Sequence, residues 1–382
     1  MRIPELDRIN ELARIAKTRA LSAEEIAERD RLRQGYIGAI TGQLKVHLAS
    51  VTVIDPEGRD VTPAALRDAQ AMGMPRYGNS KKPKTQPNTQ KGHAMRTIKN
   101  IYNAPSTHWV GNGFRVSPLF SHMGEDKQTS PFLMFDYAAP MEFVPNSSKP
   151  RGVGGHPHRG FETVTIAYAG EVAHRDSSGG GGVIKQGDVQ WMTAGNGIVH
   201  EEFHSPEFSE RGGQFEMAQL WVNLPREHKR TPPRYQHLPS DGIPVVQTEA
   251  GSVRVIAGEF DGKRGATDTF TELNVWDVSV NEGAEQVFRL PESHNLSLVV
   301  RHGEVELNGS RRMGETQLAV FEREDGEIRI RNVGSGKAEI LLLSGVPIDE
   351  PIAAHGPFVM NTREELIESF QEFNEGKYGV LD

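Results

Sequence analysis

The chain has 382 residues, a formal net charge of −8 and no cysteine. Disulfides, zinc–thiolate sites, iron–sulfur clusters and thiol nucleophiles are therefore excluded. No apolar run approaches the roughly 20 residues of a membrane span, and the N-terminus lacks the apolar segment of a signal peptide. We expect a soluble, cytoplasmic protein without a membrane partner, and two or three domains, because the chain is too long for one ordinary hydrophobic core.

Charge is distributed unevenly along the chain. Residues 1–94 carry 16 Lys and Arg against 11 Asp and Glu, a net charge of +5, whereas the remaining residues carry 27 against 40, a net charge of −13. Such an asymmetry indicates two modules of different history.

The first module, residues 1–75, is predicted to be a small α-helical hairpin. Apolar residues recur at helical spacing over residues 4–17, and Ser22 with Glu25 forms a capping box that starts a second helix. The segment resembles the YnzC-like bacterial helical-hairpin family over about residues 3–75, on the motifs Glu11-Leu-Ala, Val53-Ile-Asp-Pro-Glu-Gly58 and Asp60-Val-Thr-Pro63. Its basic side offers nucleic-acid binding as an alternative, but we favour a solvated helix face.

Residues 76–94 contain almost nothing that can be buried, and we interpret them as a flexible linker. From Arg96 onwards the pattern changes to short apolar runs between turns, which is typical of β-strands.

Two pairs of polar residues carry the strongest chemical signal. His156 and His158 are two residues apart, and so are His200 and Glu202. Because side chains alternate between the faces of a strand, the members of each pair share one face. If the two strands lie side by side, three imidazoles and a carboxylate converge, and this set suits a divalent metal such as Fe, Mn, Ni, Cu or Zn. The alternative is that they are ordinary polar residues on turns; the second pair and the flanking glycines argue against it.

The sequence around these pairs resembles known families. The spacings His-x-His-x3-Glu from His156 and Gly-x7-Gly-x-Gly-x2-His from Gly187 look like the two cupin motifs, with Gly195 where many cupins have proline. Three longer stretches are more specific: His-Pro-His-Arg-Gly-Phe-Glu-Thr-Val, Gln-Trp-Met-Thr-Ala-Gly-x-Gly-Ile-x-His and Gln-Leu-Trp-Val-Asn-Leu. They resemble the pirin family over about residues 95–382.

This resemblance implies an all-β bicupin of two jelly-roll barrels, which we place at 95–228 and 229–382 with the proline-rich residues 224–239 at the crossing. It implies that His156, His158, His200 and Glu202 hold one divalent transition metal, with Fe(II) preferred and Mn, Ni, Cu, Co or Zn as alternatives. The second barrel has no His-x-His pair, so we expect it to be metal-free. Thr362 is predicted to cap a last helix.

Three nearby residues leave alternatives open. Glu162 shares the parity of the two histidines and is a ligand in the general cupin pattern, whereas the pirin pattern assigns the acid two residues after the third histidine, Glu202. We therefore interpret Glu162 as supporting a ligand or as structural. His174 and His204 are interpreted as surface or hydrogen-bonding histidines rather than ligands.

The resemblance implies two main functions. Pirin relatives include flavonol dioxygenases of the quercetin 2,3-dioxygenase type, whose substrates are a flavonol and dioxygen and which release carbon monoxide. In this chain Glu202 would then be the catalytic base. Other pirins are iron-containing coregulators that bind a protein partner without turnover; a bicupin with a relic site is a third reading. We expect residues 176–182 to form either a hairpin tip or a mobile loop over the metal cavity. For the enzyme we expect an apolar cavity wall from four residues that could equally be core, namely Phe161, Trp191, Met192 and Phe215.

Overall fold

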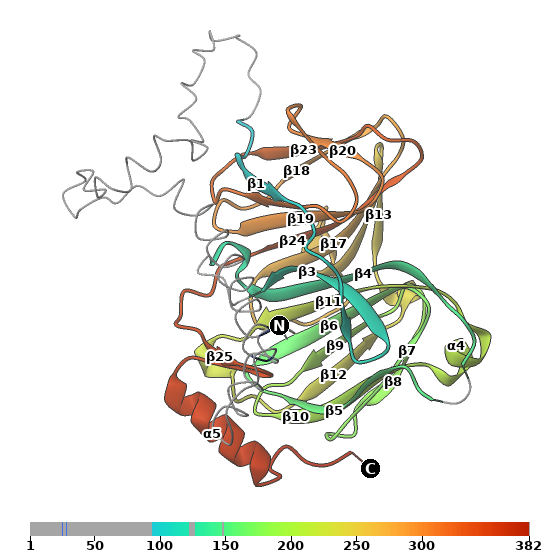
Figure 1. Ribbon diagram of the computed structural model, residues 1–382. Helices are drawn as coiled ribbons and strands as arrows, with labels where there is room; N and C mark the ends of the chain where they lie inside the picture. The colour runs from blue at the N-terminus through green and yellow to red at the C-terminus, as the bar shows by residue number, and fades with distance from the viewer. Residues whose placement is uncertain (1–24, 26–27, 29–93, 122–126, 147–148, 382) are drawn as a thin grey trace, which may run out of the picture. The chain divides into compact units, whose positions relative to one another are not determined.

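The computed structural model describes residues 25, 28, 94–121, 127–146 and 149–381 (Figure 1). Almost all of the predicted helical hairpin and linker lies outside the described residues, so those predictions stay untested. The described residues from 94 onwards belong to one compact unit.

The first half of this unit is a barrel made of two antiparallel sheets. The larger sheet has seven strands, in the order β12 (Arg234–Leu238), β9 (Val189–Thr193), β6 (Phe161–Ala169), β11 (Gly213–Asn223), β4 (Phe132–Phe143), β3 (Phe114–Ser121) and β2 (His108–Val110). The smaller sheet has four strands, in the order β5 (Gly152–His158), β10 (Ile198–His204), β7 (Val172–Asp176) and β8 (Gly181–Ile184).

The second half repeats this plan. Its larger sheet has seven strands, in the order β1 (Ile98–Tyr102), β22 (Leu318–Phe321), β19 (Asn295–His302), β24 (Ala338–Gly345), β17 (Leu273–Val280), β14 (Gly251–Ala257) and β13 (Val245–Thr248). Its smaller sheet has four, in the order β18 (Glu285–Arg289), β23 (Glu327–Asn332), β20 (Val305–Leu307) and β21 (Arg311–Met313). The predicted all-β bicupin is therefore confirmed.

Short elements connect and cover the two barrels. The helices are α4 (Pro206–Arg211) and α5 (Arg363–Asn374), and single 3₁₀ turns occupy Lys127–Thr129, Arg226–His228 and Ser240–Gly242. Two small hairpins pair β15 (Glu259–Phe260) with β16 (Lys263–Arg264) and β25 (Ala353–His355) with β26 (Phe358–Met360). No helix in the described part of the chain is long and apolar enough to cross a membrane.

The two seven-stranded sheets pack back to back, and this contact is the largest apolar core. It joins side chains such as Val164 and Leu220 of the first sheet to Val275 and Leu341 of the second. Because these sheets are covered on both faces, their strands are buried at nearly every position, as in Phe161–Ala169, where even Glu162, Thr163 and Thr165 are buried. The opposite faces line the barrel interiors, so β11 directs Met217, Gln219 and Trp221 inwards at alternate positions.

The two barrels do not divide strictly at residue 228. Arg234–Leu238 pairs with β9 of the first barrel, although the predicted division places it in the second. Ile98–Tyr102 pairs with β22 of the second barrel, although the chain then continues into the first. Which strand pairs at the edge of a sheet depends on which chain segment lies next to that edge in the folded protein. A local sequence pattern does not specify this pairing.

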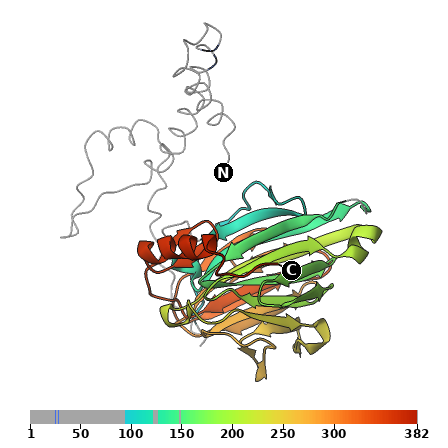
Figure 2. The same cartoon turned by 90° about the horizontal axis from the view of Figure 1, so that it is seen from below.

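The last thirty residues return to the first barrel (Figures 1 and 2). Thr362 caps α5 with its side chain and Glu365 completes a capping box, which confirms the predicted start of this helix. The buried Arg159 side chain, directly after β5, binds Glu372 of α5 and donates to the Tyr378 hydroxyl at 2.9 Å. The C-terminal segment is therefore part of the first barrel in space.

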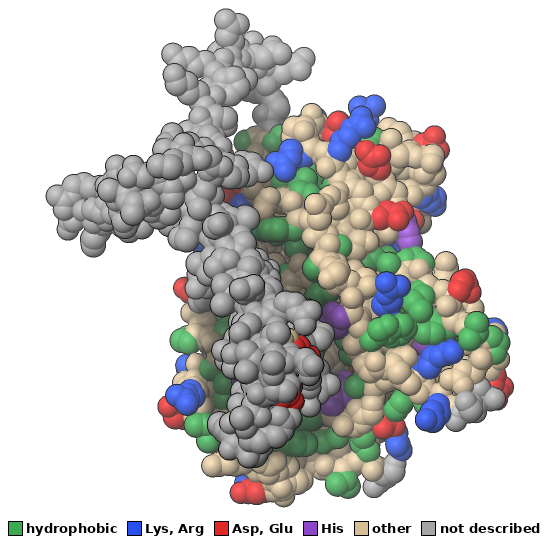
Figure 3. Space-filling view, in the orientation of Figure 1, with side chains coloured by type: hydrophobic (Ala, Val, Ile, Leu, Met, Phe, Trp, Pro, Cys, Tyr) green, Lys and Arg blue, Asp and Glu red, His purple; other side chains and the backbone are tan. Residues whose placement is uncertain are grey.

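Acidic and basic side chains are interspersed on the face in Figure 3, and no extended patch of one sign covers the described part of it.

Candidate metal centre

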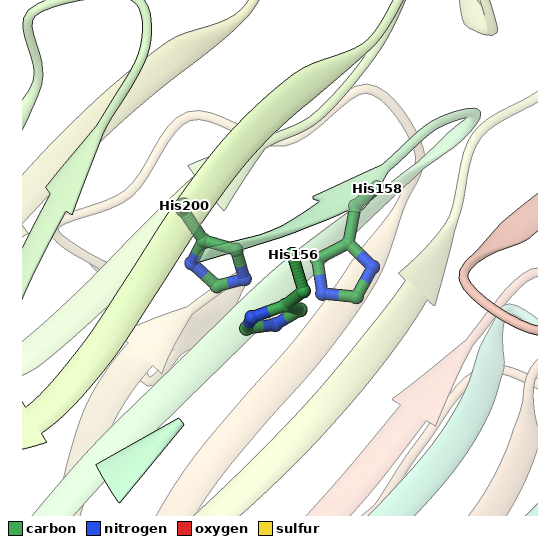
Figure 4. Close-up of side chains that lie close together, drawn as sticks. All are labelled: His156, His158 and His200. Atoms are coloured by element: carbon green, nitrogen blue, oxygen red, sulfur yellow. The ribbon is translucent and has the colours of Figure 1, made fainter. Parts of the chain in front are cut away.

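Three histidine side chains from two neighbouring strands converge inside the first barrel (Figure 4). His156 and His158 come from β5, and His200 lies opposite His156 on the antiparallel neighbour β10. The ring centroids of His156 and His200 are 4.3 Å apart, and that of His158 is 4.9 Å from each. One ring nitrogen from each residue lies within 4.8 Å of the others. The parity argument from the sequence therefore describes the actual arrangement.

Backbone carbonyls determine which nitrogen of two of these rings is open. Nδ1 of His156 lies 2.9 Å from the carbonyl oxygen of Gly154, and Nδ1 of His158 lies 3.3 Å from that of Pro357. Because a carbonyl oxygen only accepts, each Nδ1 carries the hydrogen and donates it. The lone pair of each ring is therefore on Nε2, the form that binds a metal.

His200 gives the clearest indication that the site binds a group other than a protein side chain. Its side chain is fully buried, and its Nε2 atom has no hydrogen-bond partner among the described residues. An unsatisfied buried nitrogen costs free energy unless something binds it. A metal ion shared with His156 and His158 would satisfy it, so the donor set fits a divalent metal.

The cluster is electrically suited to a cation because burial keeps the rings of His158 and His200 neutral. Burial, followed by the neighbouring His156, lowers the pKa of His158 to about 3. Burial and the surrounding histidines also lower the pKa of His200 well below its ordinary value. Neutral imidazoles keep their lone pairs available at physiological pH.

Glu202 lies on β10 together with His200, and side chains rather than backbone carbonyls hold its carboxylate. Its Oε1 atom accepts hydrogen bonds from Gln190 Nε2 at 2.7 Å and from Thr165 Oγ1 at 3.2 Å. Among the described residues its carboxylate lies close to His200 and His174, in a group whose ligand atoms are within 4.8 Å of one another. The side chain also lines the cavity described below, so Glu202 can contact a bound molecule; its carboxylate is grouped with His200 but not with His156 and His158.

Glu162 lies elsewhere. Its carboxylate accepts a hydrogen bond from Thr193 Oγ1 at 2.7 Å on the neighbouring strand β9, and it belongs to neither group of clustered ligand atoms. Burial raises its pKa to about 7, with the Thr193 hydrogen bond opposing the shift. A buried carboxyl group of this kind fits the structural reading.

The two nearby histidines are both buried rather than on the surface. His174 contacts His200 and Asp176, and His204 places its Nε2 atom 3.0 Å from the carbonyl oxygen of Gly113 within an aromatic cluster. The hydrogen-bonding alternative therefore describes both residues. Burial lowers the pKa of His204 to about 4, so the His204 ring is neutral at physiological pH.

A cavity of about 350 Å³ opens beside the histidines. This volume lies within the usual range of small-molecule sites, and the walls are mostly apolar. Its lining comprises Val110, Phe114, Val116, Met134, Asp136, Val153, His156, His158, Glu202, Met217, Gln219, Trp221, Gly356 and Pro357.

The four aromatic and methionine side chains considered as walls are core instead. Phe161, Trp191, Met192 and Phe215 are at most 2% exposed, and none lines the cavity. Phe161 packs behind Trp221, which forms the wall, with ring centroids 4.2 Å apart. Residues 176–182 form the β7–β8 hairpin tip and do not line the cavity, so the tip alternative describes them.

Sequence reasoning missed two parts of the cavity. Asp136 contributes a carboxyl group whose pKa is raised by burial, and only the acid at the end of the apolar run Phe132-Leu-Met-Phe hinted at it. The turn at Gly356 and Pro357 arrives from the far end of the chain, and no local signal relates it to β5.

Comparison with known proteins decides the family. The Pirin family model matches residues 113–222, and the model described as Pirin C-terminal cupin domain matches residues 275–379. A Pseudomonas aeruginosa protein named as a candidate quercetin 2,3-dioxygenase is 46% identical over 286 residues, which cover 74% of this chain and 99% of that protein. The chain belongs to the pirin family.

Other pirins extend the comparison. Human Pirin is 35% identical over 259 residues, covering 67% of this chain and 85% of that protein. The crystal structure of a quercetin 2,3-dioxygenase from Acinetobacter baumannii is 49% identical and covers 76% of this chain and all 100% of that one, with a TM-score of 0.72. A bacterial pirin from Escherichia coli, solved with nickel(II), is 20% identical with a TM-score of 0.50, covering 65% of this chain and 100% of that one, and shows the shared fold.

The N-terminal module has its own relatives. Residues 4–67 match the family model described as bacterial protein of unknown function (DUF896). This pirin therefore carries an additional N-terminal segment of a separate bacterial family, as its sequence indicates.

Proposed function

We propose that this pirin is a metal-dependent dioxygenase that cleaves flavonols, of the quercetin 2,3-dioxygenase type. The observation that carries the proposal is the cluster of three histidines, two of which, His156 and His158, line a mostly apolar cavity. The names of the Pseudomonas aeruginosa and Acinetobacter baumannii relatives support the same reaction class.

His156, His158, His200 and Glu202 would hold the ion, with Fe(II) preferred. When bound, a divalent transition metal supplies open coordination positions for an oxygenated enolate and for dioxygen. Three neutral imidazoles and one carboxylate leave part of the ion's positive charge uncompensated, which favours an anionic substrate oxygen.

The protein's own contribution is to bind the flavonol, exclude water and accept a proton. Apolar side chains such as Val116, Met217 and Trp221 suit flat aromatic rings. The Oε2 atom of Glu202 has no hydrogen-bond partner among the described residues, whereas Oε1 is held by Gln190 and Thr165. Glu202 would therefore be oriented to accept the proton of the flavonol 3-hydroxyl, which makes the ring susceptible to oxygen attack.

Oxygen consumption and carbon monoxide release test the proposal. The full chain would be loaded anaerobically with Fe(II), Mn(II), Co(II), Ni(II), Cu(II) or Zn(II) in separate samples and then mixed with quercetin and air. We expect equal amounts of oxygen consumed and carbon monoxide formed with at least one ion, and none with metal-free protein or with His158→Ala.

Metal-loaded protein that binds one ion per chain but never releases carbon monoxide would contradict the enzymatic proposal. That result would favour the iron-containing, protein-binding alternative.

A further inference from the structure

We propose that His174 and Asp176 are positioning residues that hold His200 in the tautomer able to bind a metal through Nε2. This inference rests on the proposed metal site, but it concerns two residues that neither contribute to the cavity wall nor belong to the proposed ligand set. It follows from three side chains joined in a row behind the histidine cluster.

When each imidazole carries a single hydrogen, this row has only one consistent arrangement of hydrogen atoms. Asp176 Oδ2 lies 3.1 Å from His174 Nε2, and a carboxylate oxygen accepts, so His174 Nε2 donates. Nδ1 of the His174 ring then carries no hydrogen and is an acceptor. It lies 3.3 Å from His200 Nδ1, which must therefore donate and leave the lone pair of His200 on Nε2.

Burial makes this arrangement decisive, because water cannot replace a missing partner. The His174 and Asp176 side chains are 0% exposed, and the whole His200 residue is also 0% exposed. His200 differs from His156 and His158 in the partner of its Nδ1 atom, because theirs are backbone carbonyls. A carbonyl can only accept, whereas a histidine can donate or accept. Among these three ligands, only His200 therefore needs a further residue, Asp176, to determine whether its partner His174 accepts.

The glycine-rich hairpin tip holds Asp176 in place. Its Oδ1 atom accepts hydrogen bonds from Ser178 N at 2.8 Å, Ser178 Oγ at 2.6 Å and Gly180 N at 3.0 Å. A Cβ atom at Gly180 would lie 2.5 Å from Asp176 Oδ2 and 2.8 Å from Tyr235 Cβ, so only glycine fits there. Tyr235 also stacks on His174, with ring centroids 4.9 Å apart and an interplanar angle of 13°.

An alternative role for His174 is that of a ligand. One of its ring nitrogens lies within 4.8 Å of ligand atoms of His200 and Glu202. However, both nitrogens of His174 already have partners in His200 and Asp176, and the ring is clamped against Tyr235. The experiments below separate the two roles.

Asp176→Asn is the sharpest substitution, because its effect can be derived atom by atom. Three donors surround Oδ1, so the asparagine oxygen occupies that position and its NH₂ group faces His174 Nε2. His174 must then accept at Nε2 and donate from Nδ1, and His200 must accept at Nδ1 and carry its hydrogen on Nε2. We expect the affinity for Co(II) to fall about 10–100-fold.

Asp188→Asn is a matched control. Asp188 also holds a turn, accepting from Lys185 N and Ser240 N at 2.9 and 2.8 Å, and it lies 3.5 Å from a histidine, His237. His237 is exposed and is not a ligand in the proposal. The Co(II) affinity of Asp188→Asn should equal that of the unsubstituted protein; an equal loss in both variants would overturn the inference.

Two substitutions at His174 separate positioning from ligation. His174→Asn places an amide oxygen near the former Nδ1 and keeps an acceptor for His200, so it should retain most of the affinity. His174→Phe keeps the stack on Tyr235 but removes the acceptor, so it should lose about 10–100-fold. Equal loss in both variants, together with a changed visible absorption spectrum of the Co(II) protein, would identify His174 as a ligand and overturn the inference.

The tautomers can be read without any metal. Two-bond proton–nitrogen NMR correlations of ¹⁵N-histidine-labelled, metal-free full chain should show His200 with its hydrogen on Nδ1 and His174 with its hydrogen on Nε2. Both assignments should invert in Asp176→Asn. If unsubstituted His200 carries its hydrogen on Nε2, the inference fails even where the protein binds metal; if the tautomers are as stated but no metal binds, the proposed function fails instead.

Discussion

The two barrels of this pirin differ in the side chains that their equivalent four-stranded sheets direct inwards. The four-stranded sheets have matching strand orders, so β5 and β10 correspond to β18 and β23. The inward residues of β5 and β10 include His156, His158 and His200, whereas those of β18 and β23 include Phe288, Ile328 and Ile330 and no histidine.

This difference extends beyond the six side chains. Phe288, Ile328 and Ile330 are buried among aliphatic neighbours and need no polar partner. Each histidine instead has a specific acceptor for Nδ1: the Gly154 carbonyl, the Pro357 carbonyl or His174. In the proposed metal site, the acceptors behind the histidines would therefore matter as well as the histidines themselves. The following predictions break or sharpen this comparison, from the largest expected effect to the smallest.

Removing one histidine should make the first barrel resemble the second. In His158→Ala, metal content measured by mass spectrometry should fall from about one ion per chain to a small fraction of that, because one of four ligands is lost. His237→Ala, at an exposed histidine on β12, is the control and should keep its metal. Unchanged metal content in His158→Ala would rule out this ligand set.

Glu202 and Glu162 can be separated by the same substitution. Glu202→Gln should lose part of its metal and, at matched loading, oxidise flavonols about 10²–10⁴-fold more slowly, because the proton acceptor is gone. Glu162→Gln should change the rate far less, since its carboxyl group is bonded to Thr193 outside the ligand cluster. Initial oxygen-uptake rates measure both; a greater loss in Glu162→Gln would reverse the assignment.

The second barrel should contribute stability without affecting the metal. Ile330→Ala removes a fully buried side chain, and the free energy of unfolding should fall by about 2–5 kcal/mol. Denaturant titration measures this loss, and a parallel metal titration of the folded protein should show unchanged affinity. A variant that keeps its stability but loses metal would show that the second barrel acts on the site.

Glu162 should make the stability of the metal-free first barrel depend on pH. Burial raises the pKa of this carboxyl group in the folded state to about 7, above its ordinary value of 4.5. The folded state therefore holds the proton more tightly, so the stabilisation is complete below pH 4.5 and is lost as the pH rises through about 7.

Relative to Glu162→Gln, the unsubstituted protein should lose up to about 3 kcal/mol of unfolding free energy across this range. Melting curves of both proteins at several pH values provide the measurement. A constant difference between them would show that the carboxyl group is not protonated on folding.

The smallest effect is expected from shortening the chain. We propose that residues 1–94 form a separate module and linker, so a chain starting at Met95 should fold, bind metal and melt near the temperature of the full chain. Metal content and melting temperature test this, and an insoluble or metal-free product would contradict it.

The sequence by itself determined the features that depend on short-range periodicity. Strand alternation places His156 with His158 and His200 with Glu202, and the capping box at Thr362 and Glu365 starts α5. These features could be predicted because a strand repeats every two residues and a helix cap spans three, whatever surrounds them.

Only the tertiary structure decided which distant residues complete the site. Pro357 bonds to His158 from 199 positions away, and His174 reaches His200 because β7 pairs with β10. It also made Trp221 a cavity wall and placed Phe161 behind it. The reason is physical: periodicity states which face a side chain occupies, but the neighbour across that face depends on long-range packing of the whole chain.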